Sequence, residues 1–228
     1  MQWAPTVARV AGSLAFRLGC YGAMVWMALW AEGRPAPRLP DALLEVVPYV
    51  PWVDRYNYLL WLVAYVPLAL WLLAKDVDRF VRYMVSSGLL ALVRGACIVV
   101  TGLGPVRGED LHAGMDLETR TQAFLHLMTP FGFFDTGAGA RVYLTKDLFF
   151  SGHTSTTLLL LLYVWRWPAL RGAMFAAHVA VVASVFFAHL HYTIDVIGAY
   201  AITWTLFTLR EGLPWGPAPV AAAAPRVP

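Results

Sequence analysis

The chain has 228 residues, of which 59% are hydrophobic and 14% are charged, whereas a soluble domain has about 25% charged residues. One soluble core cannot bury so much apolar surface, so the composition excludes a soluble protein and predicts an integral membrane protein. The net charge of +3 is spread along the chain without a run rich in Lys and Arg, which suits anionic lipid head groups and argues against nucleic acid.

Six apolar stretches predict an all-α fold, a polytopic membrane protein built as a six-transmembrane-helix bundle. Each approaches the roughly 20 mostly apolar residues that a spanning helix needs. They cover about residues 10–31, 58–74, 82–104, 148–165, 170–188 and 192–209. The first leads into further stretches and has no clear cleavage site, so we expect a retained anchor and not a signal peptide.

The connecting segments predict little regular structure. Residues 117–128 are expected to form a short amphipathic helix on the membrane surface, with Phe124, Leu127 and Met128 facing inward. Glycines at positions 132, 137 and 139 indicate a loop after it, and the Pro/Ala-rich residues 212–228 predict a disordered tail. Without an internal repeat, residues 1–228 are expected to form a single membrane domain.

The distribution of basic residues predicts the orientation of the bundle. Short turns over residues 75–82 and 165–171 carry Lys and Arg next to the spans, where the positive-inside rule counts them most. We therefore expect these turns and both termini in the cytoplasm. The starts of the fourth and sixth stretches then share the extracytoplasmic face, which is periplasmic in a bacterium and luminal or extracellular in a eukaryote.

Two polar segments lie at these two starts, KDLFFSGHT at residues 146–154 and HLHYTIDV at residues 189–196. His191 and Asp195 are four residues apart, which places them within hydrogen-bond reach on one side of a helix. A carboxylate bonded to one imidazole nitrogen fixes the tautomer and leaves the other nitrogen free as nucleophile or base. The pair is therefore a candidate catalytic unit.

The first segment is a candidate phosphate site. His153 would lie in the first turn of a helix, where unpaired backbone N–H groups and the positive end of the helix dipole favour an anion. Gly152 allows close approach of the backbone, Ser151 and Thr154 add hydroxyl groups, and His153 could protonate a leaving oxygen. Spacing alone leaves open the alternative that these residues only cap helices at the interface.

Arg94 and Lys146 are two further candidates. A charge in the middle of a span is costly, so Arg94 should face the interior, either towards a head-group phosphate or paired with an acid such as Asp147 or Asp195. Lys146 could contact the same phosphate or be interfacial. No metal or cofactor is expected, because His191 and Asp195 lack a convincing third and fourth ligand.

The motifs themselves resemble a known family. Residues 151–154, SGHT, and 191–200, HYTIDVIGAY, are similar to the S-G-H-T and H-Y-T-[VI]-D-V-[VI]-x-A-Y motifs of the sphingomyelin synthase branch of the type 2 phosphatidic acid phosphatase (PAP2) superfamily. Residues 38–41 resemble the end of its P-P-L-P-D motif, and Arg94 with Thr101 matches its R-x6-T element. The resemblance covers about residues 36–209, the expected catalytic core.

The resemblance implies six helices and a catalytic set of His153, His191 and Asp195. His191 would attack a phospholipid phosphorus with help from Asp195, and His153 would protonate the departing diacylglycerol. The head group would then pass to a ceramide-type hydroxyl or to water. Expected partners are a phospholipid donor, a ceramide- or diacylglycerol-type lipid, the bilayer and a second copy of the chain. Expected substrate-binding residues are Ser151, Gly152, Thr154, Arg94, Asp147, Lys146 and Tyr192.

Departures from the family leave the head group and the acceptor open. The segment Thr145-Lys146-Asp147 stands where the family has C-G-D, so only Asp147 agrees. Val185 stands in place of the phosphate-clamping arginine of the wider superfamily, which favours the synthase branch. The alternatives are a lipid phosphate phosphatase or phospholipase C-like hydrolase with the same site and, from another class, a non-catalytic transporter or haem-binding protein.

Overall fold

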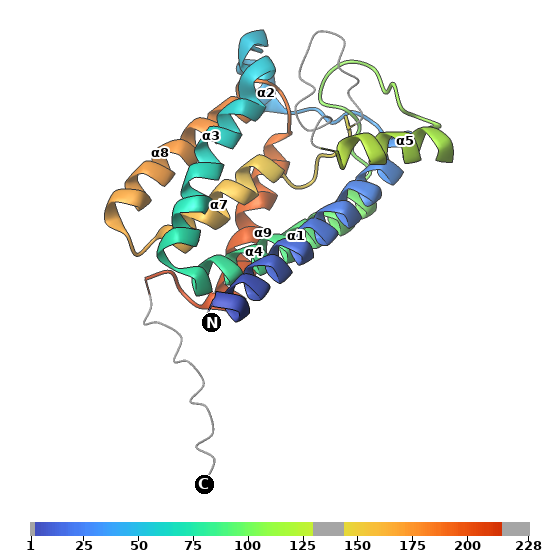
Figure 1. Ribbon diagram of the computed structural model, residues 1–228. Helices are drawn as coiled ribbons and strands as arrows, with labels where there is room; N and C mark the ends of the chain where they lie inside the picture. Colours follow the sequence, from blue (N-terminus) through green and yellow to red (C-terminus); the bar gives the residue numbers. More distant parts are fainter. Residues whose placement is uncertain (1–2, 130–143, 216–228) are drawn as a thin grey trace.

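The computed structural model describes residues 3–129 and 144–215, and within these ranges it contains helices and no strand (Figure 1). The predicted loop glycines at 132, 137 and 139 and most of the predicted tail lie outside the described residues. The helices are α1 (Trp3–Glu32), α2 (Ala42–Val46), α3 (Pro51–Lys75), α4 (Val77–Val100), α5 (Leu117–Leu127), α7 (Gly152–Val164), α8 (Pro168–Phe187) and α9 (Thr193–Glu211).

The expected six-span count is not confirmed. Within the described residues, four helices are long and apolar enough to cross a membrane, namely α1, α3, α4 and α8. The helix α7 has 13 residues, because Ser151 caps its start through the Thr154 amide and the preceding residues are not helical. The helix α9 is long enough, but Asp195 and Arg210 lower its hydropathy.

The helix α7 forms the centre of the bundle. It packs against α3, α4, α8 and α9, and ten of its 13 residues are buried, including the leucines at 158–162. A helix that is apolar on all sides is stable when other helices surround it. Its first turn, which carries His153, is therefore held by the rest of the protein.

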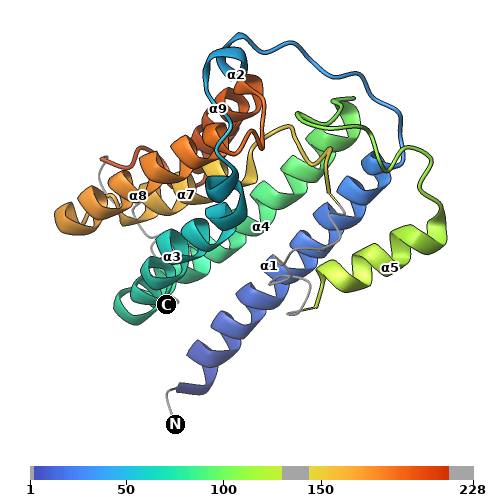
Figure 2. The same cartoon turned by 90° about the horizontal axis from the view of Figure 1, so that it is seen from above.

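The helices α1 and α4 run side by side and parallel (Figure 2). Arg9 near the start of α1 pairs with Asp78 near the start of α4, at 2.6 Å. The close approach depends on Gly95, where a Cβ atom would lie only 2.3 Å from Met27. Packing at this distance places Arg94 at the interface between the two helices.

The helix α5 confirms the predicted amphipathic helix and its inward side. It packs against α1, with Phe124 and Leu127 in the apolar cluster that α1 and α4 share. Met128 lies against Gly22, where a Cβ atom would be 3.3 Å from its methyl carbon. Leu117, at the start of α5, and Leu125 are exposed.

The starts of α7 and α9 lie at one end of the bundle, as the alternation of spans predicts. The backbone amide of Ser151 reaches the carbonyl oxygen of Asp195 at this end. At the other end, Arg82 of α4 pairs with Glu211 of α9 at 3.1 Å. The start of α1 lies near the end of α9 there (Figure 1). The two motif segments therefore share one face.

Candidate active site

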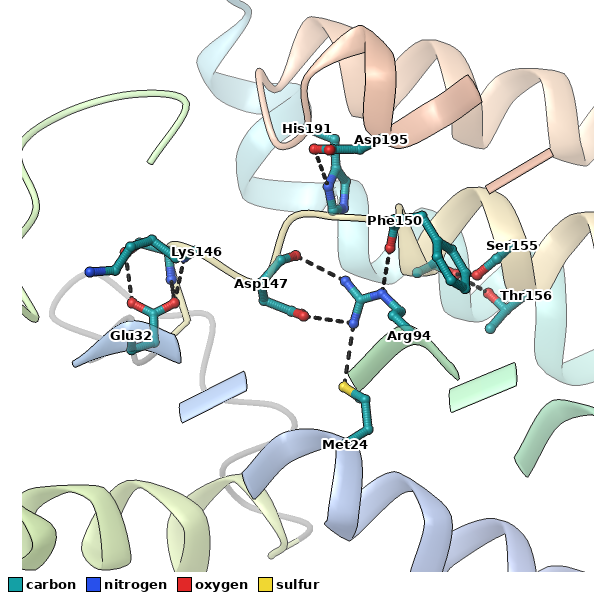
Figure 3. Close-up of polar contacts among 12 residues, drawn as sticks. Met24, Glu32, Arg94, Lys146, Asp147, Phe150, Ser155, Thr156, His191 and Asp195 are labelled. Carbon is teal, nitrogen blue, oxygen red and sulfur yellow. Dashed lines mark hydrogen bonds and ion pairs between the residues drawn. The ribbon is translucent and has the colours of Figure 1, made fainter. Parts of the chain in front are cut away.

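The His191–Asp195 pair forms at the start of α9. Asp195 Oδ2 accepts a hydrogen bond from the backbone amide of Tyr192 at 2.9 Å and lies 3.3 Å from His191 Nδ1 (Figure 3). Both side chains are buried, and Asp195 is 0% exposed. One carboxylate thus caps its own helix and holds the imidazole. Nothing in the described part of the chain hydrogen-bonds to His191 Nε2, which leaves this nitrogen for chemistry.

His153 faces this pair from the first turn of α7. The ring centroids of His153 and His191 are 6.5 Å apart, with an angle of 64° between the ring planes. His153 Nε2 is buried and has no hydrogen-bond partner among the described residues, and the same holds for Thr154 Oγ1 and Asp195 Oδ1. Buried polar atoms without partners are costly, so their presence at the two helix starts points to a group that the site receives.

Backbone contacts join the two motif segments. The Ser151 amide donates to the Asp195 carbonyl at 3.1 Å, and Ser151 Oγ accepts from the Thr154 amide at 3.3 Å. Gly198 on α9 lets Phe149 pack against the helix, since a Cβ atom there would lie 2.7 Å from Phe149. Ser151, Gly152 and Thr154 therefore lie beside the histidines, where the sequence predicts them.

Arg94 is the buried clamp beneath this turn. Its guanidinium donates to the Phe150 carbonyl at 2.6 Å and the Asp147 carbonyl at 2.9 Å, and it lies 2.7 Å from the Asp147 carboxylate (Figure 3). A Cβ atom on Gly152 would be 3.2 Å from the central guanidinium carbon of Arg94. Of the two sequence interpretations, the geometry favours the pair with Asp147 over a direct phosphate contact. Arg94 and Asp147, both expected to bind substrate, hold each other and the segment before α7.

Lys146 lies apart from the histidines, contrary to its expected contact with the phosphate. Its ammonium group is 2.6 Å from Asp110 Oδ1 and 2.8 Å from the Arg34 carbonyl, and the residue is 3% exposed. Its backbone amide donates to the Glu32 carboxylate, which also accepts from the Thr145 amide at 2.5 Å. Figure 3 shows this cluster on the far side of Asp147 from Arg94. Local carboxylate and carbonyl groups satisfy the charge, so Lys146 anchors the segment.

Tyr192 was expected to contact the substrate, but its hydroxyl is engaged by two loops of the protein. Its hydroxyl donates to the Gly104 carbonyl at 3.1 Å and accepts from the Leu39 amide at 3.1 Å, and the side chain is 2% exposed. The phenol at the start of α9 thus hydrogen-bonds to two loops, at the Gly104 carbonyl and the Leu39 amide, since buried backbone groups need hydrogen-bond partners. Tyr192 therefore tethers the start of α9.

Sequence reasoning missed Trp61 and gave Asp41 no role. The Trp61 indole on α3 donates to Thr156 Oγ1 at 2.9 Å, and its ring lies edge-on to His153 with centroids 5.8 Å apart. A tryptophan inside an uncharged stretch carries no signal of such a contact. The Asp41 carboxylate accepts from the Thr193 amide at 2.6 Å, at the start of α9. Its place in the P-P-L-P-D-like segment was the available signal.

His178 is the candidate haem ligand among the alternatives left open by the sequence. His178, the histidine deepest in an apolar stretch, has both ring nitrogens engaged, by Thr157 at 2.8 Å and Tyr200 at 2.7 Å. It is a core histidine. Across residues 3–129 and 144–215, no three His, Cys, Asp or Glu side chains come together as metal ligands would.

Comparisons with known proteins agree with the motifs. The family model described as PAP2 superfamily C-terminal matches residues 146–211. Human sphingomyelin synthase-related protein 1 is 31% identical over 183 residues, which cover 75% of this chain and 43% of that protein. Human phosphatidylcholine:ceramide cholinephosphotransferase 2 is 30% identical over 186 residues, which cover 75% of this chain and 49% of that protein.

The aligned part thus spans less than half of each of these relatives. The family match contains both the SGHT turn and the start of α9, and the four long apolar helices identify an integral membrane protein. These matches support the sphingomyelin synthase-like branch of the PAP2 superfamily as the family to which the chain is similar.

Proposed function

We propose that the protein is a membrane lipid phosphotransferase that moves a phosphorylated head group from a glycerophospholipid to a ceramide-type or other lipid alcohol. The observation that carries the proposal is the buried His191–Asp195 contact facing a His153 ring with an unpartnered nitrogen. The name of the human cholinephosphotransferase specifies phosphatidylcholine and ceramide, which supports these two substrate classes.

The first half-reaction uses His191 as nucleophile. Asp195 holds the proton on Nδ1, so Nε2 attacks the phosphorus and the bond from phosphorus to the diacylglycerol oxygen breaks. The negative charge of the bound donor phosphate favours protonation of His153, which then donates this proton to that oxygen as diacylglycerol leaves. The product is a phosphohistidine on His191 and a neutral His153.

The second half-reaction reverses the proton transfer. The neutral His153 takes the proton from the acceptor hydroxyl, whose oxygen attacks phosphorus as the bond to His191 breaks. The imidazoles regain their starting protonation states. A glycerophospholipid and a lipid alcohol are thus converted into diacylglycerol and a new phospholipid, with no metal or cofactor in either step.

The start of α7 supplies the phosphate-binding groups in this proposal. The amides of Gly152 and His153 lie in the first turn, where a helix leaves N–H groups without an internal partner. The hydroxyl of Thr154 is buried without a partner among the described residues. Arg94 supports this turn from below through Asp147.

We place the catalytic core over residues 36–209 and the site on the extracytoplasmic face. The basic residues at the opposite end of the bundle support that orientation, because Arg79, Arg82, Arg166 and Arg171 lie near the ends of helices there.

Lipid products distinguish the candidate reactions. The purified protein is incubated in vesicles of phosphatidylcholine and phosphatidylethanolamine, with and without ceramide, in excess chelator, and products are identified by mass spectrometry. We expect diacylglycerol and a phosphosphingolipid in equal amounts. Diacylglycerol with a free phosphorylated head group would instead identify a hydrolase that uses the same first half-reaction.

Substitution tests the assigned groups. His191→Ala and Asp195→Ala should abolish turnover, and His153→Ala should lower it by about 100- to 10,000-fold, while the proteins still insert and purify. His126→Ala, on α5 away from the pair, is the matched control and should retain activity. Turnover that survives His191→Ala would exclude the covalent step.

A further inference from the structure

Asp41 lies outside both motifs, yet its carboxylate joins the starts of two helices. It caps α2 by accepting from the amides of Leu43 at 3.1 Å and Leu44 at 3.3 Å. It also accepts from the Thr193 amide at 2.6 Å and from Thr193 Oγ1 at 2.8 Å. Thr193 is the first residue of α9, so a loop some 150 positions away in sequence supplies a cap to the helix that carries the catalytic pair.

Two carboxylates therefore share the first turn of α9. Asp195 receives the Tyr192 amide, and Asp41 receives the amide of the next residue, Thr193. Asp195 also holds His191, so a change in this turn moves the imidazole. A negative charge at a helix start is stabilising, which gives Asp41 a second hold on the turn.

The same loop holds the turn from a second point. The Leu39 amide donates to the Tyr192 hydroxyl at 3.1 Å, two residues before Asp41. Asp41 and Tyr192 also both line a recess of about 580 Å³. Partial burial raises the pKa of Asp41, but the hydrogen bonds from Thr193, Leu44 and Leu43 together outweigh it and hold the pKa below its usual value, so Asp41 is a carboxylate at neutral pH.

We propose that Asp41 is a positioning residue: by holding Thr193, it fixes the start of α9 so that the His191–Asp195 pair faces His153. Asp41 acts through Thr193 and touches no reacting atom. The proposal deepens the proposed function and rests on it for its kinetic consequence, whereas its structural consequence can be measured without any substrate.

Asp41→Asn is the kinetic test. Asparagine has one side-chain oxygen, so it cannot accept both hydrogen bonds that Thr193 donates to Asp41. The start of α9 then shifts and the His191 imidazole is misplaced. We expect kcat to fall about 100-fold, the effect of a displacement near 1 Å. The KM for the donor lipid should stay unchanged, because the phosphate-binding turn of α7 is intact. Asp116→Asn is the matched control, since Asp116 caps α5 through the Thr119 amide at 2.8 Å, and it should leave kcat unchanged.

Thr193→Val supplies a second variant. It removes the hydroxyl donor and keeps the backbone amide, so it should lower kcat less than Asp41→Asn does. The double variant should be no slower than Asp41→Asn, because both changes break one interaction. Losses that multiply, or a wild-type kcat in either single variant, would overturn the proposal. If Asp41→Asn fails to fold, Thr193→Val tests the proposal by itself. The proposal then requires that its kcat falls while its KM stays constant.

A chemical label separates this proposal from the proposed function. Carbethoxylation of His191 by diethyl pyrocarbonate, measured by peptide mass spectrometry, needs no lipid. Loss of the cap should raise the labelling rate of His191 about fivefold, the factor expected for loss of a helix cap, with no change at His126. An unchanged rate at His191 would overturn the positioning role, even if lipid transfer were confirmed. A protein that turns over no lipid but shows the expected labelling would instead overturn the proposed function alone.

Discussion

The backbone amide of Ser151 donates to the backbone carbonyl of Asp195 over 3.1 Å. This main-chain bond connects the turn that carries His153 to the turn that carries His191. This backbone bond helps to set the separation of the two imidazoles, and substitution of the reacting side chains leaves it in place. Variants of the reacting groups should accordingly report chemistry more than folding.

The leaving group tests the acid role of His153. A diacylglycerol oxygen needs a proton as it departs, whereas p-nitrophenolate does not. In a single turnover, His153→Ala should therefore slow release of diacylglycerol from phosphatidylcholine by about 100- to 10,000-fold and release of p-nitrophenolate from p-nitrophenyl phosphocholine far less. His191→Ala should abolish both. Equal losses of leaving-group release on the two substrates in His153→Ala would assign His153 to another role.

Arg94→Met should destabilise the protein by about 3–5 kcal/mol, because it leaves the Asp147 carboxylate and two carbonyl groups without their partner. Thermal unfolding in detergent measures the effect. Adding Asp147→Asn should recover part of the loss, since the unpaired charge is then removed. A variant with unchanged unfolding and only a raised KM would show that Arg94 binds the phosphate directly.

Lys146→Met separates anchoring from substrate binding. The change strands the Asp110 carboxylate and should lower the free energy of unfolding by about 1–3 kcal/mol. The KM for phospholipid should not change, because the ammonium group lies away from the histidines. Lys75→Met, at the end of α3, is the control and should change neither quantity. A KM that rises in Lys146→Met but not in Lys75→Met would instead show that Lys146 contacts the phosphate.

Gly152→Ala should cost about 1–3 kcal/mol, because its methyl group would press on an Arg94 guanidinium that three contacts hold in place. Gly172→Ala on α8 is the matched control, since nothing lies within 4 Å of the added carbon. That change should stabilise the helix by about 1 kcal/mol. Circular dichroism during heating compares the two. Equal behaviour of the two variants would contradict the packing beneath the SGHT turn.

Asp41 also predicts a dependence of stability on pH. Its pKa is lower in the folded protein than in the unfolded chain, so its carboxylate stabilises the fold at neutral pH. That contribution is lost as the pH falls below about 4, through the folded pKa. The difference in unfolding temperature between wild type and Asp41→Asn should therefore be present at neutral pH and shrink in acid. A difference that stays constant into acid would contradict it.

The sequence predicts most of the helices and the core of the site. Hydropathy locates the apolar helices, and the i,i+4 spacing of His191 and Asp195 predicts their contact, because both signals are local. The alternation of spans brings His153 to the same face. The pairing of Arg94 with Asp147 appears among the sequence alternatives, but nothing local selects it over a phosphate.

The remaining differences have physical causes that a hydropathy pattern does not contain. Residues 148–151 are apolar enough to count towards a span, yet Ser151 is a helix cap, and that signal would have shortened α7. The partners of Lys146 come from segments 36 and 112 residues away, so spacing near Lys146 carries no trace of them.

The shortness of α7 decides how deep in the membrane the reaction takes place. Its 13 residues extend about 20 Å, while the hydrocarbon core of a bilayer is roughly 30 Å thick. Arg94, which supports the start of α7, lies six residues before Val100, so α4 continues about 9 Å beyond the site.

In the proposed reaction, a donor phosphate must therefore be drawn inward from the level of its neighbours in the leaflet before His191 can reach it. Water has to follow it into a region of low water content, whereas the hydroxyl of a lipid alcohol arrives there with its own acyl chains. In the proposed reaction, a helix that is too short to cross the bilayer thus favours a lipid acceptor over hydrolysis.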